Sequence, residues 1–428
     1  MDIMQRRSLT IPGDIIHIPT FKNHIIVLNS SQPVFDLLER RGNIYSNRMH
    51  GVMLHELIRL EPSTVFAEYG QEWRNHRKIY SQQMNINTVK KFQSYQVAAA
   101  RDLLSVLLTS PEHFMKHCRH FAAGIVMNIA YGHQVAREND EFVMLAETNG
   151  RQLSQAFQPG TRYTLPESEG ADIGLTRVNQ RDGTVKSCFV SNSLEEIGTD
   201  AETNEDVKTV KAIAGGIFGA GAITTSSSLN SFILAMVLYP EVQKKAQEEL
   251  DGVVGASRLP LFEDRPKLPY INAIVKEVLR WFPVIPTGIP HVTTEEDVYA
   301  GYRIPKGSII IPNTWNLLHD PATYPDPSVF RPERFLPDKN GGVARDPAVN
   351  GAFGYGRRIC PGRNLAEATT WIAAASILST FNIQHAMDEN GRDIDVSHAL
   401  ESVPGIFKYS QIYLAGAGAY QSQFFSLQ

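Results

Sequence analysis

Short runs of β-branched residues open the chain, and a helical pattern replaces them after about thirty positions. The stretches 14–18 and 24–29 are rich in Ile and Val and flank a turn-like segment, 19–23, which predicts a β-hairpin. Beyond it, apolar residues recur at three- and four-residue spacing, as in amphipathic helices. We expect such helices over 32–40, 73–80, 89–108 and 117–131.

A long proline-free segment in the middle of the chain predicts one very long helix. No proline occurs from 203 to 239, and Pro240 then ends the segment. At 1.5 Å per residue such a helix is about 50 Å long and crosses a whole domain. Its middle, 212–228, is rich in Gly, Ala, Ser and Thr. These small residues let either a neighbouring helix or a bulky cofactor approach the backbone closely.

The second half predicts further helices with small strands between them. A helix over 270–281 precedes strands and turns as far as Trp315, a loop-like stretch over 319–350, and a final helix over 364–380. The fold class is therefore mostly α with small β-sheets, an α+β protein. Because no repeat or linker-like tract interrupts it, we expect residues 1–428 to form a single domain.

Composition excludes several classes of function but does not identify one. The chain has 428 residues, 43% of them hydrophobic, and a net charge of -4, which gives no basic surface for nucleic acid. Its three cysteines, Cys118, Cys188 and Cys360, lie far apart, so we expect neither a disulfide scaffold nor a structural zinc site, and a reducing compartment. No uncharged apolar run reaches the roughly 18 residues that a membrane span needs, so we expect no transmembrane segment.

The segment 353–362, Phe-Gly-Tyr-Gly-Arg-Arg-Ile-Cys-Pro-Gly, carries the chemistry. Gly356 and Gly362 permit backbone angles or close approaches that side chains would block, as a loop against a flat cofactor requires. Cys360 precedes a helix N-terminus, which favours thiolate over thiol. Since Pro361 has no amide hydrogen, donors to the sulfur must come from Gly362 onward. For a bare Cys-Pro-Gly, a buried and inert thiol is the more common arrangement.

The full string resembles the haem-binding signature of the cytochrome P450 family, Phe-x-x-Gly-x-Arg-x-Cys-x-Gly. Every specified position matches: Phe353, Gly356, Arg358, Cys360 and Gly362. The resemblance implies a helix-rich domain with haem between the long central helix and the cysteine loop. It also implies that Cys360 is the axial thiolate ligand of the haem iron and that Arg358 pairs with an anionic group of the cofactor.

Further segments resemble the same family in the same order. Glu277 and Arg280 stand at i and i+3 of one helix, a spacing that by itself usually means a surface pair. The resemblance adds Arg334, in Phe-Arg-Pro-Glu-Arg-Phe, as the third member of a network that braces the cysteine loop. Trp73 and Arg77 match the family's Trp-x-x-x-Arg helix and would face a haem propionate.

Two more positions keep alternatives open. His291 falls where many family members place another propionate partner, although it could be a plain turn histidine. The Trp73 helix could likewise be an ordinary amphipathic helix.

The oxygen-activation stretch of the family matches Gly-Ala-Gly-Ala-Ile-Thr-Thr over 219–225. The resemblance implies that the small residues leave a groove for O2, and that Thr224, next to Thr225, hydrogen-bonds water and delivers protons. Ile223 replaces the family's usual acid, so we expect weaker coupling of NADPH use to product. Ile285, Thr287 and residues 220–225 would form the substrate pocket.

The resemblance therefore implies a monooxygenase that inserts one atom of O2 into a hydrophobic small molecule, in secondary metabolism as in fungal members. No dinucleotide fingerprint is present, so electrons must come from a partner, an NADPH-cytochrome P450 reductase with or without cytochrome b5.

Three regions depart from the family: the N-terminal membrane anchor and hinge, the substrate roof over about 160–185, which is shorter, and the tail beyond about 408. The family usually resides at the endoplasmic reticulum membrane, but here we expect a cytoplasmic or peripherally membrane-associated protein. Two alternatives remain, a reductase-independent haem-thiolate enzyme that rearranges or uses peroxides, and a truncated, non-catalytic product.

Overall fold

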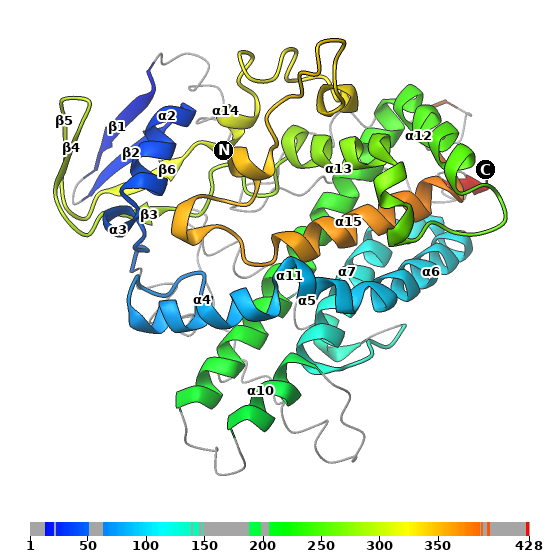
Figure 1. Cartoon of the computed structure of the whole chain (residues 1–428), viewed down its shortest axis with the longest axis horizontal. Coiled ribbons are helices and arrows are strands. Elements are labelled where there is room, and N and C mark those ends of the chain that lie inside the picture. The colour runs from blue at the N-terminus through cyan, green and yellow to red at the C-terminus, as the bar shows by residue number, and fades with distance from the viewer. Residues whose placement is uncertain are drawn as a thin grey trace.

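A computed structural model describes most of the chain (Figure 1). The described residues are 13–20, 23–50, 63–137, 140–144, 148, 188–197, 205–385, 387, 392–393 and 425–427. The predicted substrate roof over about 160–185 and the tail beyond 408, apart from 425–427, lie outside these residues. The prediction of a single domain over 1–428 stays a prediction.

The predicted hairpin is confirmed, and it forms one edge of the largest described sheet. This sheet has the order β1-β2-β6-β3. Strand β2 pairs antiparallel with β1 and parallel with β6, which carries β3 on its other side. Its strands are β1 (Ile15–Pro19), β2 (His24–Leu28), β6 (Ile309–Pro312) and β3 (His291–Val292). Two small antiparallel pairs are β4 (Asp297–Tyr299) with β5 (Tyr302–Ile304), and β7 (Phe381–Ile383) with β8 (Phe425–Leu427).

Helices make up the greater part of the described chain, so the prediction of an α+β protein that is mostly α is confirmed (Figure 1). The α-helices are α2 (Ser31–Val34), α3 (Gly42–Tyr45), α4 (Gln71–Gln83), α5 (Ile86–Val89), α6 (Gln93–Thr109), α7 (Phe114–Tyr131), α10 (Phe189–Ile197), α11 (Glu205–Leu238), α12 (Pro240–Val253), α13 (Pro269–Trp281), α14 (Thr314–Leu318) and α15 (Arg363–Leu378). Short π- or 3-10 helices are η1 (Phe35–Arg40), η3 (Lys90–Phe92), η4 (Pro111–His113), η5 (Phe262–Lys267), η6 (Pro332–Phe335), η7 (Ala348–Ala352) and η8 (Gly356–Arg358).

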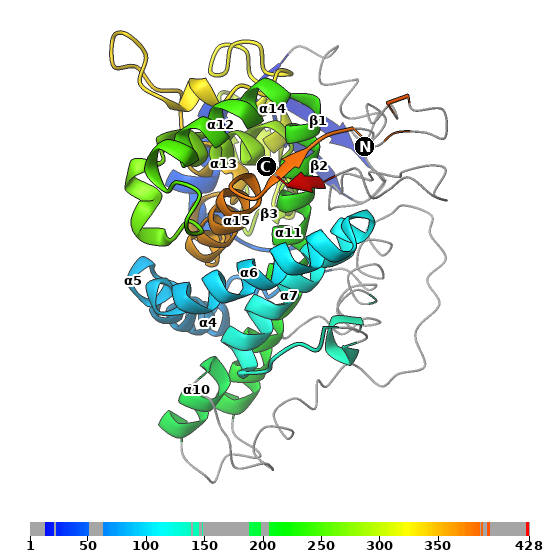
Figure 2. The ribbon, with the colours of Figure 1, turned by 90° about the vertical axis from the view of Figure 1, so that its right-hand side faces the viewer.

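Helix α11 is the predicted long helix and runs through the molecule from the end where α10 lies toward the end where α12 lies (Figures 1 and 2). Its 34 residues correspond to about 51 Å. Among the described residues, the segment 206–238 is the one helix long and apolar enough to cross a membrane, and 78% of its most apolar window is buried inside the protein. Much of its apolar surface therefore belongs to the core.

The small residues of α11 partly serve helix packing. A Cβ at Gly221 would lie 2.5 Å from Cγ1 of Val126 in α7, and one at Gly216 would lie 2.6 Å from the hydroxyl of Tyr80 in α4. Both are too close for an alanine. Gly215 and Gly219, by contrast, have open space where a Cβ would stand. The tight helix crossing foreseen as one alternative is thus present, while part of α11 keeps an open side.

Candidate active site

The loop carrying Cys360 is held in shape by its own backbone and by glycine. The Cys360 N–H donates to the carbonyl of Phe353 at 2.8 Å, which closes the loop. Gly354 and Gly356 have φ of +79° and +54°, angles that L side chains rarely adopt. A Cβ at Gly356 would also collide with the carbonyl oxygen of Leu38. The predicted need for glycine at 356 is therefore confirmed.

Gly362 differs from Gly356. Its φ is -86°, which any residue adopts, and the nearest atom to a Cβ there would be Sγ of Cys360 at 3.9 Å. No unusual backbone angle explains this glycine. Close approach to a cofactor remains the predicted reason for it.

The surroundings of Cys360 correct the expectation that the helix N-terminus favours its thiolate form. Burial raises the pKa of the thiol, while the Gly362 N–H, Arg77 and Arg363 act to lower it. The amide after Pro361 thus acts on the sulfur as predicted. Burial nevertheless outweighs these groups, so the helix N-terminus alone does not make the thiolate the favoured form. A thiolate here requires a positive partner of its own, such as a metal ion.

Arg77 connects helix α4 to the cysteine loop. Its Nη1 donates to the carbonyl oxygen of Ile359, the residue before Cys360, at 2.7 Å. Burial lowers the pKa of Arg77, and the nearby Cys360 opposes this shift. Trp73, one turn earlier, is buried beneath the same guanidinium, which lies 5.8 Å from its ring centroid. Trp73 and Arg77 therefore both flank the loop.

Arg358 is buried and bonded to carbonyl groups. It donates to the carbonyls of Ser46, Thr64 and Ala67 at 2.7, 3.2 and 2.8 Å. Its guanidinium also lies over the Trp73 ring, 4.6 Å from the centroid. Because a guanidinium has five N–H donors, two remain for another acceptor.

His291 and Arg48 lie close to Arg358. Nδ1 of His291 donates to the carbonyl of Tyr45 at 2.7 Å, so this buried ring is fixed in orientation. Burial, and next Arg48, lower the pKa of His291 well below its ordinary value. Arg48 is a buried site residue that the sequence analysis missed. It donates to carbonyls of Val65, Ile289 and Pro290, up to 242 positions away in the chain, so no local spacing indicates it.

These groups form what we call the cation set: the buried Arg48 and Arg358, the half-buried Arg77, and His291, a buried ring that becomes a cation only when it is protonated. In the part of the chain that the structure describes, none of the four forms an ion pair with a carboxylate. Burial, then Arg77, lower the pKa of Arg358 to about 9. Buried guanidinium groups without a carboxylate partner are costly, so this arrangement favours the binding of an anionic ligand. A haem with two carboxylate side chains next to a cysteine fits this arrangement.

The predicted bracing network is present and almost fully buried. Glu277 accepts from Nε and Nη2 of Arg280 at 2.7 and 2.8 Å and from Nε of Arg334 at 3.1 Å. The backbone N–H of Arg331 adds a fourth donor at 2.8 Å. Side-chain exposure is 0% for Glu277 and Arg280 and 3% for Arg334, so this is not the surface pair that the i, i+3 spacing usually gives.

Thr224 lies on the less buried side of α11, with Gly219, Ala220 and Ile223. Its hydroxyl donates to the carbonyl of Ala220 one turn earlier, at 2.8 Å, which leaves the oxygen free to accept. Thr225 is buried, with 6% exposed. Thr224 is therefore the more accessible of the two threonines.

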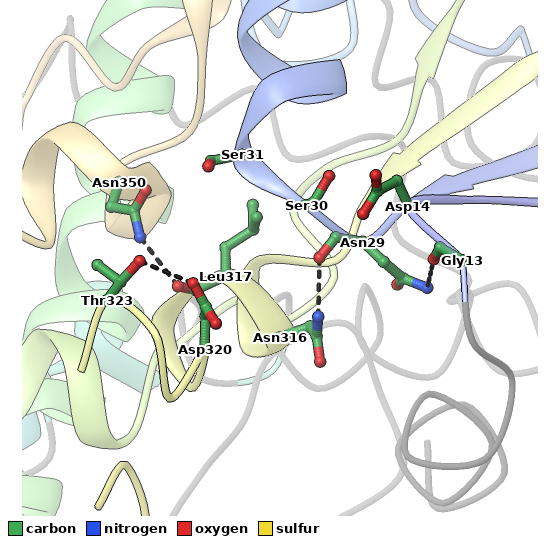
Figure 3. Close-up of a pocket in the computed structure, with 10 residues that line it drawn as sticks. All are labelled: Gly13, Asp14, Asn29, Ser30, Ser31, Asn316, Leu317, Asp320, Thr323 and Asn350. Carbon is green, nitrogen blue, oxygen red and sulfur yellow. Dashed lines mark hydrogen bonds between the residues drawn. The ribbon is translucent and has the colours of Figure 1, made fainter. Parts of the chain in front are cut away.

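A described cavity of about 280 Å³ lies elsewhere, between the start of the hairpin and the α14 region (Figure 3). Its lining is mostly polar: Gly13, Asp14, Asn29, Ser30, Ser31, Asn316, Leu317, Asp320, Thr323 and Asn350. None of the residues predicted for the active site belongs to this lining. The cavity is thus separate from the substrate pocket expected around Ile285, Thr287 and 220–225.

Comparisons with known proteins agree with this site. The family model described as Cytochrome P450 matches residues 175–409. A cytochrome P450 monooxygenase of Armillaria gallica is 36% identical over 90% of this chain and 81% of its own length. The chain belongs to the cytochrome P450 family.

Other relatives and a solved structure extend this result. Tryptamine 4-monooxygenase of Psilocybe cyanescens is 34% identical over 93% of the chain and 84% of its own length. A zebra fish cytochrome P450 with abiraterone has a TM-score of 0.74 at 21% identity, covering 100% of this chain and 99% of that one, and shows the fold. This cytochrome P450 is an oxidoreductase of the monooxygenase type, and its cofactor is haem, as in the rest of the family.

Proposed function

We propose that this cytochrome P450 uses Cys360 as the thiolate ligand of its haem and inserts one atom of O2 into a hydrophobic small molecule. The reaction is R–H + O2 + NADPH + H+ giving R–OH + H2O + NADP+. The observation that carries the assignment is the cation set beside the cysteine loop, which forms no ion pair with a carboxylate among the described residues. When bound, the haem supplies oxygen activation, with thiolate donation favouring cleavage of the O–O bond.

The chain's own residues hold and orient the cofactor in this proposal. Trp73, Arg77, Arg358, His291 and Arg48 would bind the two propionates. Phe353 and Gly362 would shape the loop against the porphyrin. The buried network of Glu277 with Arg280 and Arg334 keeps neighbouring segments rigid, so that the sulfur stays in position.

In this proposal, residues on the less buried side of α11 deliver protons. Because the Thr224 hydroxyl already donates to Ala220, its oxygen can accept a hydrogen bond from water and keep that water ordered. Ile223 offers no carboxylate to supply the next proton. Thr224 with Thr225 and ordered water would therefore deliver protons more slowly than an acid does.

Electrons would come from an NADPH-cytochrome P450 reductase, with cytochrome b5 as a second donor. Exposed cations stand on α4 and on either side of Cys360 in the chain: Arg74 and Lys78 on α4, Arg357 before the cysteine and Arg363 after it. Such a surface attracts an acidic redox protein and accelerates association at low salt. Charge reversal by Lys78→Glu should therefore slow reduction by the reductase and weaken the dependence of that rate on salt, while haem content stays unchanged.

Fungal relatives include an enzyme named for tryptamine, and secondary metabolites such as terpenoids or polyketides fit an apolar pocket. We place the protein in the cytoplasm or on a membrane surface.

A carbon monoxide difference spectrum tests the central assignment. The reduced wild-type protein should show the red-shifted Soret band of a thiolate ligand, and Cys360→Ser should lose it together with turnover. The matched control is Cys118→Ser, which changes a buried cysteine in α7. If Cys360→Ser keeps both the spectrum and the turnover, the proposal is wrong.

Ile223 favours a second candidate, a haem-thiolate enzyme that rearranges peroxides without a reductase. Such chemistry needs no acid to protonate bound oxygen. Turnover of an organic hydroperoxide without NADPH, combined with no NADPH-dependent turnover, would select this candidate over the monooxygenase.

A further inference from the structure

His76 is a buried histidine of α4 that neither the sequence motifs nor the proposed mechanism use. It lies on the turn between Trp73 and Arg77, and only 1% of it is exposed. One ring nitrogen, Nδ1, is 2.9 Å from the hydroxyl of Thr64. The other, Nε2, is buried without a partner in the described part of the chain. A buried ring nitrogen without a hydrogen-bond partner costs stability, and a functional role would explain why a histidine stands here.

Thr64 belongs to the segment 63–67, which supplies acceptors to two site arginines. The carbonyls of Thr64 and Ala67 accept from Arg358, and the carbonyl of Val65 accepts from Nε of Arg48 at 3.1 Å. The placement of both guanidinium groups therefore depends on where this segment stands.

No regular helix or strand fixes the segment 63–67. Two side chains of α4 reach the Thr64 hydroxyl, His76 by the hydrogen bond above and Tyr80 by a second one. Helix α4 in turn carries Trp73 and Arg77, the other two groups that face the cofactor. His76 therefore links the two sets of propionate-binding residues, one set on a rigid helix and one held by a loop.

We propose that His76 is a positioning residue for haem binding: through Thr64 it fixes the segment 63–67 and thereby orients the guanidinium groups of Arg358 and Arg48 toward the propionates. This inference rests on the proposed haem-binding role of those arginines. His76 does not touch the iron or the substrate and is not a catalytic residue.

The proposed role depends on one ring nitrogen of His76, Nδ1. Burial lowers the pKa of His76, so the ring is neutral and carries one proton. Whichever way that proton lies, the contact with Thr64 needs a polar atom at the Nδ1 position. The amide of asparagine can place one near Nδ1, whereas glutamine reaches the Nε2 position instead.

The test measures haem loss from the purified, haem-loaded protein to an excess of apomyoglobin. His76→Leu, which keeps the bulk and removes the hydrogen bond, should lose haem roughly tenfold faster, the equivalent of one hydrogen bond. His76→Asn should stay close to wild type, and His76→Gln should behave like His76→Leu. Equal rates for His76→Asn and His76→Leu would mean that the ring only fills space, and would overturn the proposal.

Variants of the partner residue cover the case in which His76→Leu does not fold. Thr64→Val removes the hydroxyl at constant size and should also accelerate haem loss roughly tenfold, while Thr64→Ser should not. The double variant His76→Leu/Thr64→Val should be no worse than Thr64→Val alone, because Thr64→Val already removes the bond to His76. Additive effects would contradict the proposal.

Arg358→Ala separates failure of this inference from failure of the proposed haem site. If Arg358→Ala leaves haem loss unchanged, the assignment of the cation set is wrong. If Arg358→Ala accelerates haem loss and both His76→Leu and Thr64→Val leave it unchanged, the cation set stands and the positioning role of His76 falls.

Discussion

Nη1 of Arg77 donates to the carbonyl oxygen of Ile359 at 2.7 Å, so helix α4 holds the peptide immediately before the cysteine. Arg77, which the family motif assigns to a haem propionate, therefore also holds the cysteine loop. One guanidinium can do both, because its five N–H donors point in several directions at once. Loss of Arg77 should consequently affect both the cofactor and the loop that carries its ligand.

Replacement of Arg77 by alanine should lower haem content and convert part of the protein to a form without the thiolate spectrum. Arg77→Lys should recover part of the haem content, because one ammonium group replaces the charge but cannot bond both the carbonyl and a propionate. Haem per polypeptide and the carbon monoxide difference spectrum measure the two effects. Lys78→Ala, an exposed neighbour in α4, is the matched control and should leave both unchanged.

The buried network around Glu277 should be a large determinant of stability. Glu277→Gln leaves the fully buried Arg280 without its ionic partner, which should cost about 3–5 kcal/mol of unfolding free energy. Denaturant unfolding followed by far-UV circular dichroism measures this loss. Glu333→Gln is the control: its ion pair with Lys245 is partly exposed, so the loss there should stay below about 1 kcal/mol. Comparable losses in the two variants would contradict the argument.

Stability should fall in mildly acidic solution, and His291 should contribute. Burial, then Arg48, lower the pKa of His291 in the folded chain well below the value of about 6.5 expected when unfolded. As pH falls through about 6.5, the unfolded chain takes up a proton that the folded chain does not. The stabilisation is therefore present above this pH and is lost below it, by up to about 1.4 kcal/mol per pH unit.

The measurement compares unfolding free energies at about pH 7.5 and about pH 5.5 in wild type and His291→Asn. Asparagine can still donate to the Tyr45 carbonyl but does not titrate, so the pH dependence should become smaller. Haem loading should also reduce it in the wild type, because a propionate near the ring favours the protonated form. A pH dependence that haem leaves unchanged would argue against His291 as a propionate partner.

The fold was predictable where the pattern is local and long. Helix α11 lies in the proline-free segment that predicted it, and the β1–β2 hairpin lies where the β-branched runs and the turn residues between them predicted it. Most of the predicted helix over 89–108 is α6, and the 3-10 turn η3 separates it from α5, a short helix that Asn85 caps with its side chain. Pro240 ends α11 as predicted and also begins α12, since proline fits the first turn of a helix.

The sequence predicted only those site residues that belong to recognisable motifs. Cys360, Arg358 and Glu277 stand in recognisable strings, and Glu277 has the partners that its motif predicts, Arg280 and Arg334. Arg48 and His76 do not, because their roles depend on carbonyl and hydroxyl groups of the segment 63–67, which the tertiary fold alone brings to them. Burial likewise changed the expectation for the Cys360 thiol, since the sequence shows the helix N-terminus and not the desolvation of the sulfur.

Introduction of an acid at position 223 should improve coupling. Ile223 stands beside Thr224 on the less buried side of α11, where a carboxylate can reach water held by the threonine. Ile223→Asp should therefore release less hydrogen peroxide per NADPH oxidised and raise the ratio of product to peroxide severalfold, since a positioned acid contributes about 100-fold or more to a proton transfer. Ile223→Asn introduces a side chain as large as aspartate but without the acid, and its ratio of product to peroxide should stay near that of the wild type. Equal peroxide release from all three proteins would show that proton supply at 223 does not limit coupling.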